Sequence, residues 1–154
     1  LDFAAINESE NRSTVNPIGA LKKIQNDIHF KGHNIKIIVV NDSGIEINEN
    51  IFVRSITNVL NNAISVSTEI ELVADITNEL IKFSIHDNGP GIPDSEKSNV
   101  FKPFYRIDKS RNQNTFNSGL GLATTKALLS TINGKISLHD SYMGGLEVII
   151  EIPN

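Results

Sequence analysis

Two segments that alternate apolar and polar residues follow each other closely in the middle of this sequence. They cover residues 68–76 and 80–87 and are separated by only three residues. Because successive side chains of a strand point to opposite faces of a sheet, the pattern predicts an antiparallel hairpin with one buried face. A second hairpin is predicted over 135–152, across the glycine-containing turn 141–145. The fold must therefore contain a sheet with a large antiparallel part.

Helical patterns lie between these strands. From Glu49 to Val66 the apolar residues trace one face of an amphipathic helix. Asn16 and Pro17 are typical of a helix cap followed by a first helical residue, and a third helix is predicted over 119–132. Weaker patterns predict a strand over 35–40, a short strand over 45–47 and a short helix over 95–100. Since strands and helices do not alternate regularly, we expect a mixed, mostly antiparallel sheet covered on one face by helices.

The size and composition are those of one globular domain. The chain has 154 residues, 39% hydrophobic and 21% charged, and a formal net charge of -4. This charge argues against nucleic acid or an anionic membrane surface as a partner. Because the chain opens on Leu1, we expect a fragment of a longer protein. Residues 1–15 would be the tail of a preceding dimerisation helix region or a linker, and residues 16–154 the domain.

The strand over 80–87 ends on a carboxylate that is followed by two glycines and two prolines, in the stretch DNGPGIP. Asp87 at a strand end commonly accepts hydrogen bonds within a turn. It could equally accept from the amine of a ligand that enters above the sheet edge. Gly89 and Gly91 would then let that ligand approach the backbone.

Two asparagines and a glycine pair mark further candidate positions. Asn58 and Asn62 stand four residues apart and share one face of their helix, where they either face solvent or serve a site. Gly119 and Gly121 lie at the start of the third helix, where unpaired backbone N–H groups favour anions. A flexible helix start would explain the glycines equally well.

The tract 107–118 has neither a helical nor a strand period and is predicted to be a mobile loop. Cations lie in or beside it, and aromatic residues precede it: Arg106, Lys109 and Arg111, and Phe101, Phe104 and Tyr105. The cations are either solvated or belong to a lid that brings positive charge to a polyphosphate. The aromatic residues would then fasten that lid to the core.

Four of these stretches occur in a characteristic order, NVLNNA, DNGPGIP, FKPFYR and GLGLA. Together they resemble the N box, first glycine box, F box and second glycine box of the catalytic ATP-binding domain of bacterial two-component sensor histidine kinases. The resemblance covers roughly residues 16–153. It implies the Bergerat fold, an α/β two-layer sandwich with about five strands and three main helices on one face. It also implies ATP and Mg²⁺ as cofactors, with transfer of the γ-phosphoryl group to a histidine on a separate dimerisation domain and relay to a response regulator.

The resemblance also implies roles for individual residues. Asp87 would accept from the adenine amino group and select against guanine, while Gly91 would line the base pocket. Asn62 would ligate magnesium, and Asn58 and Arg106 would act in catalysis beside the phosphates. The implied nucleotide-binding set is completed by Gly89, Ile92, Phe101, Tyr105, Lys109, Arg111, Ser118, Gly119, Leu120, Gly121 and Leu122.

Departures from the family pattern keep alternatives open. Ser65 and Val66 stand where many members have a lysine and an aromatic residue, and Phe116 stands in the second glycine box where glycine is usual. A degenerate module that senses nucleotide or docks a partner without kinase activity is one alternative. An ATP hydrolase of the same fold is another, although such enzymes usually carry a glutamate at the position of Asn58, and an amide cannot act as a general base.

The resemblance sets expectations for partners and location as well. None of the four histidines has the setting of a phosphoacceptor, so the target histidine would lie in another domain of the parent protein. The isolated fragment would be monomeric and would bind no nucleic acid. It would be cytoplasmic, and the parent could be anchored in the inner membrane by segments outside this sequence.

Overall fold

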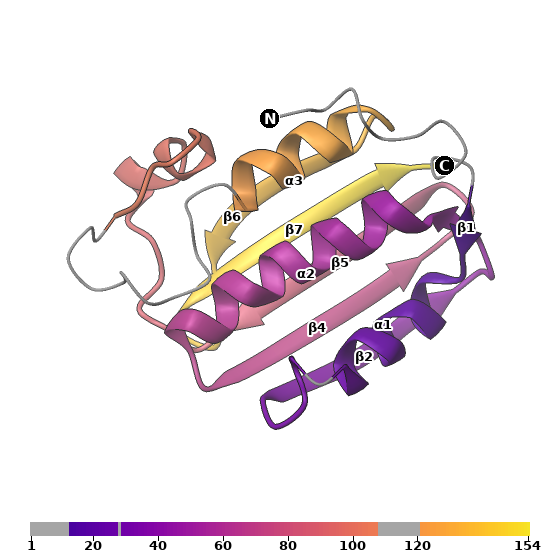
Figure 1. Cartoon of the computed structure of the whole chain (residues 1–154), viewed down its shortest axis with the longest axis horizontal. Helices are drawn as coiled ribbons and strands as arrows, with labels where there is room; N and C mark the ends of the chain where they lie inside the picture. Colours follow the sequence, from indigo (N-terminus) through magenta and orange to yellow (C-terminus); the bar gives the residue numbers. More distant parts are fainter. Residues whose placement is uncertain (1–12, 28, 108–120) are drawn as a thin grey trace.

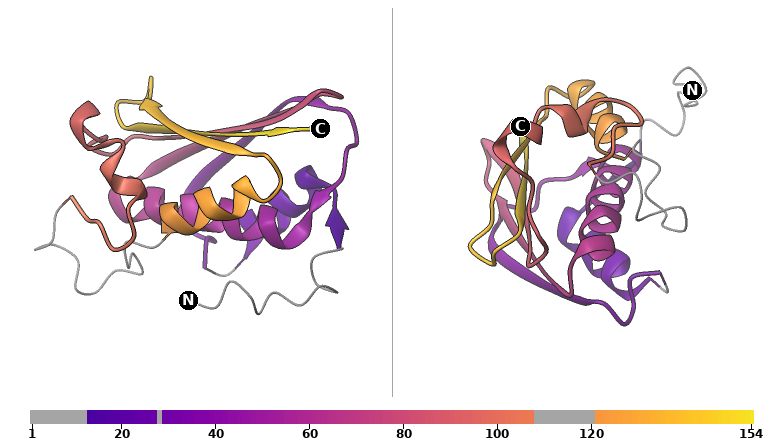
Figure 2. Two further views of the ribbon diagram at one scale, coloured as in Figure 1. Left: turned by 90° about the horizontal axis from the view of Figure 1, so that it is seen from above. Right: turned by 90° about the vertical axis from the view of Figure 1, so that its left-hand side faces the viewer.

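The computed structural model describes residues 13–27, 29–107 and 121–154. These residues form two layers, a five-stranded sheet and a layer of helices that covers one of its faces (Figure 1; Figure 2). The strands are β1 Thr14–Val15, β2 Asn34–Asp42, β3 Ile47–Asn48, β4 Glu69–Ile76, β5 Leu80–Asp87, β6 Lys135–Asp140 and β7 Leu146–Pro153. The helices are α1 Pro17–Asn26, α2 Glu49–Val66 and α3 Gly121–Ser130, with short 3₁₀ turns at η3 Asp94–Glu96 and η4 Asn99–Phe101.

The sheet is mixed and mostly antiparallel, in the order β2-β4-β5-β7-β6. Only β2 and β4 run parallel, while β4/β5, β5/β7 and β6/β7 are antiparallel. Both predicted hairpins are present, with Ile70 opposite Asp87 in the first and Asp140 opposite Leu146 in the second. The expected fold class is therefore confirmed.

The core lies between the sheet and α2, which runs across the middle of the helical layer (Figure 1). Phe83 at the centre of β5 is fully buried, and its ring lies 5.1 Å from that of Phe52 on α2. The helix begins as the amphipathic pattern predicts, and the side chain of Asn48 caps it by accepting a hydrogen bond from Ile51 N–H. Burial of one face of α2 fixes which way its polar face points.

The helix expected over 95–100 is instead a pair of 3₁₀ turns, η3 and η4. This short segment lies between Pro93 and Pro103. Lys102, which precedes the second proline, is extended, with φ −74° and ψ 135°. Proline disfavours helical backbone in the residue before it, so there is no room for a longer helix.

The small strands β1 and β3 pair antiparallel beside the main sheet. Glu49 N–H donates to the Ser13 carbonyl, so the chain just before α1 is attached to the start of α2. The short strand expected over 45–47 is thus found at Ile47–Asn48, whereas β1 was not anticipated. Within the described ranges, no helix combines the length and apolar character needed to cross a bilayer.

Candidate functional site

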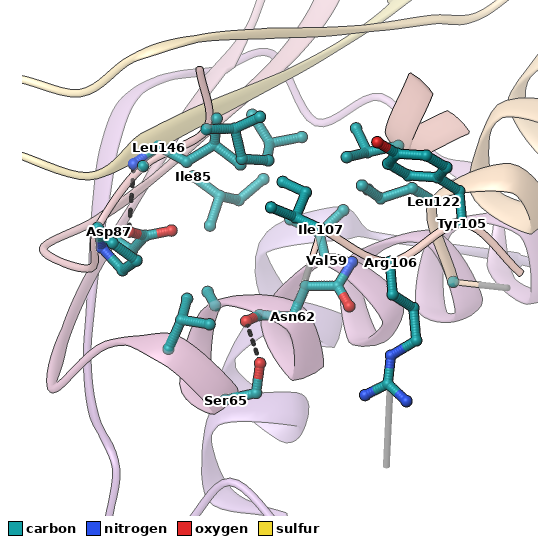
Figure 3. Close-up of a pocket in the computed structure, with 18 residues that line it drawn as sticks. Val59, Asn62, Ser65, Ile85, Asp87, Tyr105, Arg106, Ile107, Leu122 and Leu146 are labelled. Atoms are coloured by element: carbon teal, nitrogen blue, oxygen red, sulfur yellow. Dashed lines mark hydrogen bonds between the residues drawn. The ribbon is translucent and has the colours of Figure 1, made fainter. Parts of the chain in front are cut away.

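A pocket of about 280 Å³ opens where the end of β5 meets the C-terminal half of α2 (Figure 3). Most of its wall is apolar, and a few polar groups converge on it. The lining residues are Val59, Asn62, Ala63, Ser65, Val66, Ile85, Asp87, Pro90, Gly91, Ile92, Val100, Tyr105, Arg106, Ile107, Gly121, Leu122, Leu146 and Val148. An apolar cavity with few convergent polar groups is the usual form of a small-molecule site.

Asp87 is a buried carboxylate on the floor of this pocket, only 4% exposed. Its Oδ1 accepts hydrogen bonds from Gly89 N–H at 2.9 Å and from Leu146 N–H at 3.2 Å. Among the described residues Oδ2 has no hydrogen-bond partner, and it is not sealed from the pocket. The carboxylate therefore has one oxygen held by the protein and one available to a ligand (Figure 3).

The loop after Asp87 is fastened to the connection between α2 and β4. Asn88 Oδ1 accepts from the N–H groups of Thr68 and Glu69, at 2.9 and 3.0 Å. Gly89 has no room for a side chain, because a Cβ there would lie 2.8 Å from the carbonyl oxygen of Val66. The first glycine of DNGPGIP thus allows this loop to lie close to the backbone at the end of α2.

Asn58 and Asn62 share one face of α2 as predicted, and both are half-buried rather than simply solvated. The Asn62 side chain lines the pocket (Figure 3). Asn58 turns its Nδ2 toward α3, where it donates to the Gly121 carbonyl at 3.4 Å and to Thr125 Oγ1 at 3.3 Å. The two amides therefore have different surroundings, one in the pocket and one at the seam between α2 and α3.

The segment after η4 closes one side of the pocket with Tyr105, Arg106 and Ile107. The Tyr105 hydroxyl donates to the Glu96 carboxylate, and this hydrogen bond raises the pKa of the tyrosine above its ordinary value. Phe101 packs partly against the core, and its ring lies 5.1 Å from Lys126 Nζ.

A second link holds the η3 turn near β6. Lys97 Nζ lies between the carboxylates of Asp94 and Asp140 and bonds to both. Phe104 differs from the other aromatic residues nearby. It is 65% exposed and has a positive φ, so it does not anchor the segment to the core as expected.

The structure brings many of the predicted residues to one place. Those that line the pocket are Asn62, Asp87, Gly91, Ile92, Tyr105, Arg106, Gly121 and Leu122. Those that lie beside it without lining it are Asn58, Gly89 and Phe101. Those that lie outside the described residues are Lys109, Arg111, Ser118, Gly119 and Leu120. The functional roles given to these residues stay predictions.

Sequence reasoning missed the contribution of the second hairpin to the pocket. Leu146 and Val148 of β7 line it, and Leu146 N–H bonds to Asp87. The consecutive glycines Gly144 and Gly145 just before β7 were the available signal. Their meaning depends on the meeting of this turn with Asp87, which lies 59 positions before Leu146 in the sequence, and periodicity cannot show such a contact.

The fold is shared by solved structures of histidine kinases. The nucleotide-free catalytic domain of the histidine kinase ThkA superposes with a TM-score of 0.75 and 21% identity, over 92% of this chain and 96% of that one. Full-length ShkA, solved in complex with AMPPNP, superposes with a TM-score of 0.77 and 23% identity, over 92% of this chain and 30% of that one.

Residues 47–154 match the family described as histidine kinase-, DNA gyrase B-, and HSP90-like ATPase, and the chain belongs to this family. Sensor histidine kinase CpxA of Escherichia coli (strain K12) is 32% identical over 107 residues, which make up 69% of this chain and 23% of CpxA. The chain thus spans about a quarter of that relative's length. The family resemblance seen in the four motifs is confirmed.

Proposed function

We propose that this chain is the catalytic ATP-binding domain of a sensor histidine kinase. It binds ATP in the pocket of Figure 3 and transfers the γ-phosphoryl group to a histidine on a separate dimerisation domain of its parent protein, for relay to a response regulator. The observation that carries the proposal is Asp87, a buried carboxylate with Oδ1 held by two backbone N–H groups and Oδ2 left to the pocket.

The pocket favours adenine for two reasons. Its walls are apolar and suit a flat aromatic base, with Ile85, Ile92 and Leu146 among them. The carboxylate can only accept hydrogen bonds when ionised, and the exocyclic amine of adenine donates. Guanine carries a carbonyl oxygen at the same ring position, so two acceptors would face each other. Leaving a buried acceptor unpaired costs about 1–3 kcal/mol, which is enough to discriminate between the bases.

Asn62 fits a role in holding magnesium. Its side chain lines the pocket and has no hydrogen-bond partner among the described residues, so its amide oxygen is available. Mg²⁺ prefers hard oxygen ligands and keeps several waters, so one amide oxygen with phosphate oxygens is sufficient. When bound, the ion offsets the charge of the phosphates. No group of three or more His, Cys, Asp or Glu side chains that could hold a metal occurs in the described part of the chain.

Phosphoryl transfer is favoured over hydrolysis by the chemistry of Asn58. Hydrolases of this fold usually have a glutamate there, which takes a proton from the attacking water. The Asn58 amide already donates to α3 and cannot take a proton at neutral pH. Arg106 lines the pocket and would place a cation near the phosphate groups, where charge develops during transfer.

This assignment implies two partners and a location. The partners are the dimerisation domain that carries the phosphoacceptor histidine and a response regulator that receives the phosphoryl group. The domain would work in the cytoplasm, and its parent could be anchored in the inner membrane by segments outside this sequence.

A phosphotransfer assay tests the proposal. The chain is mixed with a separate dimeric domain that carries a phosphoacceptor histidine, together with ATP labelled at the γ-phosphoryl group. Acid-labile label on the second domain supports the kinase. Free phosphate alone supports a hydrolase, and binding with neither product supports the nucleotide-sensing module that Ser65 and Val66 in the pocket wall would suit.

Matched carboxylate variants make this assay specific. Asp87→Asn should reduce labelling at least tenfold, because a carboxylate hydrogen bond contributes about 1.5–3 kcal/mol. Asp75→Asn on the neighbouring strand is the control, since the Asp75 side chain accepts a hydrogen bond from Asn41 far from the pocket and the variant should label like the wild type. Equal labelling in both variants would contradict the assignment of Asp87.

A further inference from the structure

We infer that the turn between β6 and β7 positions the Asp87 carboxylate and thereby sets the base specificity of the pocket. The turn comprises residues 141–145 and is called the Ser141 turn here. It lies outside the four motifs that identify the family. The inference rests on the proposed function, because it concerns how the same pocket recognises adenine.

The end of the Ser141 turn touches Asp87 through two backbone groups. Gly145 N–H donates to the Asp87 carbonyl at 3.1 Å, and Leu146 N–H donates to Asp87 Oδ1 at 3.2 Å. With Gly89 N–H on the same oxygen, Oδ1 receives two hydrogen bonds, one from the loop directly after β5 and one from the start of β7. The pair of donors fixes the rotation of the carboxylate, so Oδ2 is the oxygen presented to the base.

Gly145 permits this contact because nothing larger fits. A Cβ at this position would lie 2.1 Å from Asp87 Oδ1 and 2.6 Å from both the Asp87 carbonyl oxygen and Gly89 N. Two of these three atoms are backbone, so a small rearrangement of flexible side-chain ends cannot make room. A side chain at position 145 must therefore displace either the turn or Asp87.

The other end of the turn is held by a buried serine. Ser141 Oγ accepts from Met143 N–H at 3.0 Å and lies 3.0 Å from His86 Nδ1. Ser141 N–H donates to the Gly145 carbonyl at 2.8 Å, which closes the turn. Ser141 and His86 are only 9% and 6% exposed, so these bonds are shielded from water.

His86 and Asp87 are consecutive residues of β5 and so point to opposite faces of the sheet. One face of the strand end holds the start of the Ser141 turn through His86. The other face receives the end of the turn through Asp87. The turn thus wraps around the end of β5. Tyr142 holds the Ser141 turn on the His86 side. Its ring lies 4.6 Å from that of His86, and its hydroxyl donates to Glu71.

The motif DNGPGIP and the Ser141 turn therefore have different roles in recognition of the base. Asp87 supplies the acceptor, whereas Ser141 and Gly145 are positioning residues that decide where the free oxygen points. Loss of the turn contacts would leave the carboxylate in place with Gly89 N–H as the remaining donor to Oδ1, so its rotation would be less restricted. Contacts to the ribose and phosphates would remain, while the distinction between a base amine and a base carbonyl would weaken.

Two nucleotides that differ at the base position in question provide the test. ADP carries an amine at carbon 6, and inosine diphosphate carries a carbonyl oxygen there. Calorimetry with the full chain should show that the wild type prefers ADP by roughly tenfold or more. Ser141→Ala and Gly145→Ala should weaken ADP binding by about that factor and inosine diphosphate binding by less than about twofold. A merely structural defect would weaken both nucleotides equally.

Gly44→Ala is the control for loss of stability alone. Alanine at Gly44 is disfavoured by the positive φ of 72°, but a Cβ there would meet nothing within 4 Å, and the residue lies far from the pocket in the connection after β2. It should keep the wild-type preference. If Gly145→Ala does not fold, Ser141→Ala decides alone, because it removes only the hydroxyl.

The outcomes separate the two claims. A wild type that binds neither nucleotide contradicts the proposed function. A wild type that prefers ADP, together with a Ser141→Ala variant that keeps the full preference, overturns the inference and leaves the proposed function standing.

Discussion

Asn58 and Asn62 lie one helical turn apart on α2, yet their amides face different surroundings. Asn58 donates to α3, whereas Asn62 lines the pocket without a partner among the described residues. An asparagine inside a helix is locally unfavourable, because its side chain competes for backbone hydrogen bonds. In Asn58 that cost is offset by the contacts to α3. In Asn62 we propose that ligand binding accounts for it.

Removing the Asn62 amide should abolish the effect of magnesium on nucleotide binding. In the wild type, Mg²⁺ is expected to tighten ADP binding, and in Asn62→Ala it should have little effect, while binding without magnesium stays similar. Calorimetry with and without Mg²⁺ measures both quantities. Asn61→Ala is the matched control, because the Asn61 side chain faces His29 at 2.8 Å instead of the pocket. Equal magnesium dependence in Asn62→Ala and the wild type would refute the assignment.

Phe83 should carry a large share of the stability. Its side chain is fully buried between the sheet and α2, so Phe83→Ala leaves a cavity and should lower the free energy of unfolding by roughly 3–5 kcal/mol. Urea unfolding followed by circular dichroism measures the change. Phe104→Ala is the comparison, since Phe104 is 65% exposed and its loss should change the free energy by less than about 1 kcal/mol. A small effect at Phe83 would mean that the core is packed differently.

Elements whose pattern is local were predicted well from the sequence. Helix α2 and the hairpins β4/β5 and β6/β7 lie within one residue of the bounds that periodicity indicates, because each buries one face along its own length. The pairing of β1 with β3 was missed, since a strand of two residues has no period. The parallel register of β2 on β4 also depends on contacts between segments distant in the sequence.

The residues of the candidate site likewise fall into those recognisable from the local sequence and those that depend on contacts between distant segments. Asp87, Asn62 and the glycines of DNGPGIP could be singled out because their residue types stand out locally. The role of Leu146 and Gly145 could not, because it arises only when the second hairpin meets the end of β5. Segment 95–100 was predicted wrongly because Pro103 limits it more than its composition suggests.

The ion pair between Asp94 and Lys97 at the η3 turn should make a pH-dependent contribution to stability. The hydrogen bond and charge of Lys97 lower the pKa of Asp94, so the folded state favours the ionised carboxylate. Its contribution to stability is present above the ordinary pKa of 3.8 and is lost as the pH falls through the lowered value. Melting temperatures of the wild type and Asp94→Asn should therefore differ more at about pH 6 than at about pH 3. A difference independent of pH would contradict this link.

Residues 13–15 join the domain as a whole, although they precede its first helix. Ser13 and Thr14 bond to Glu49 and Glu46, and Val15 pairs with Ile47 of β3. A chain that begins at Asn16 should therefore be less stable than one that begins at Ser13, by roughly 1–3 kcal/mol, because at least three hydrogen bonds are lost. Chemical denaturation of the two chains measures this. Equal stability would place the boundary of the folding unit at Asn16.

The central claim is that the buried carboxylate of Asp87, in an apolar pocket, makes this domain bind adenine nucleotides selectively. Calorimetric titration of the wild type and Asp87→Asn with ADP and GDP tests it most directly. We predict that the wild type binds ADP at least tenfold more tightly than GDP, and that Asp87→Asn loses most of this preference through weaker ADP binding. A folded wild-type chain that binds neither nucleotide at millimolar concentration, or binds both equally, would contradict the claim.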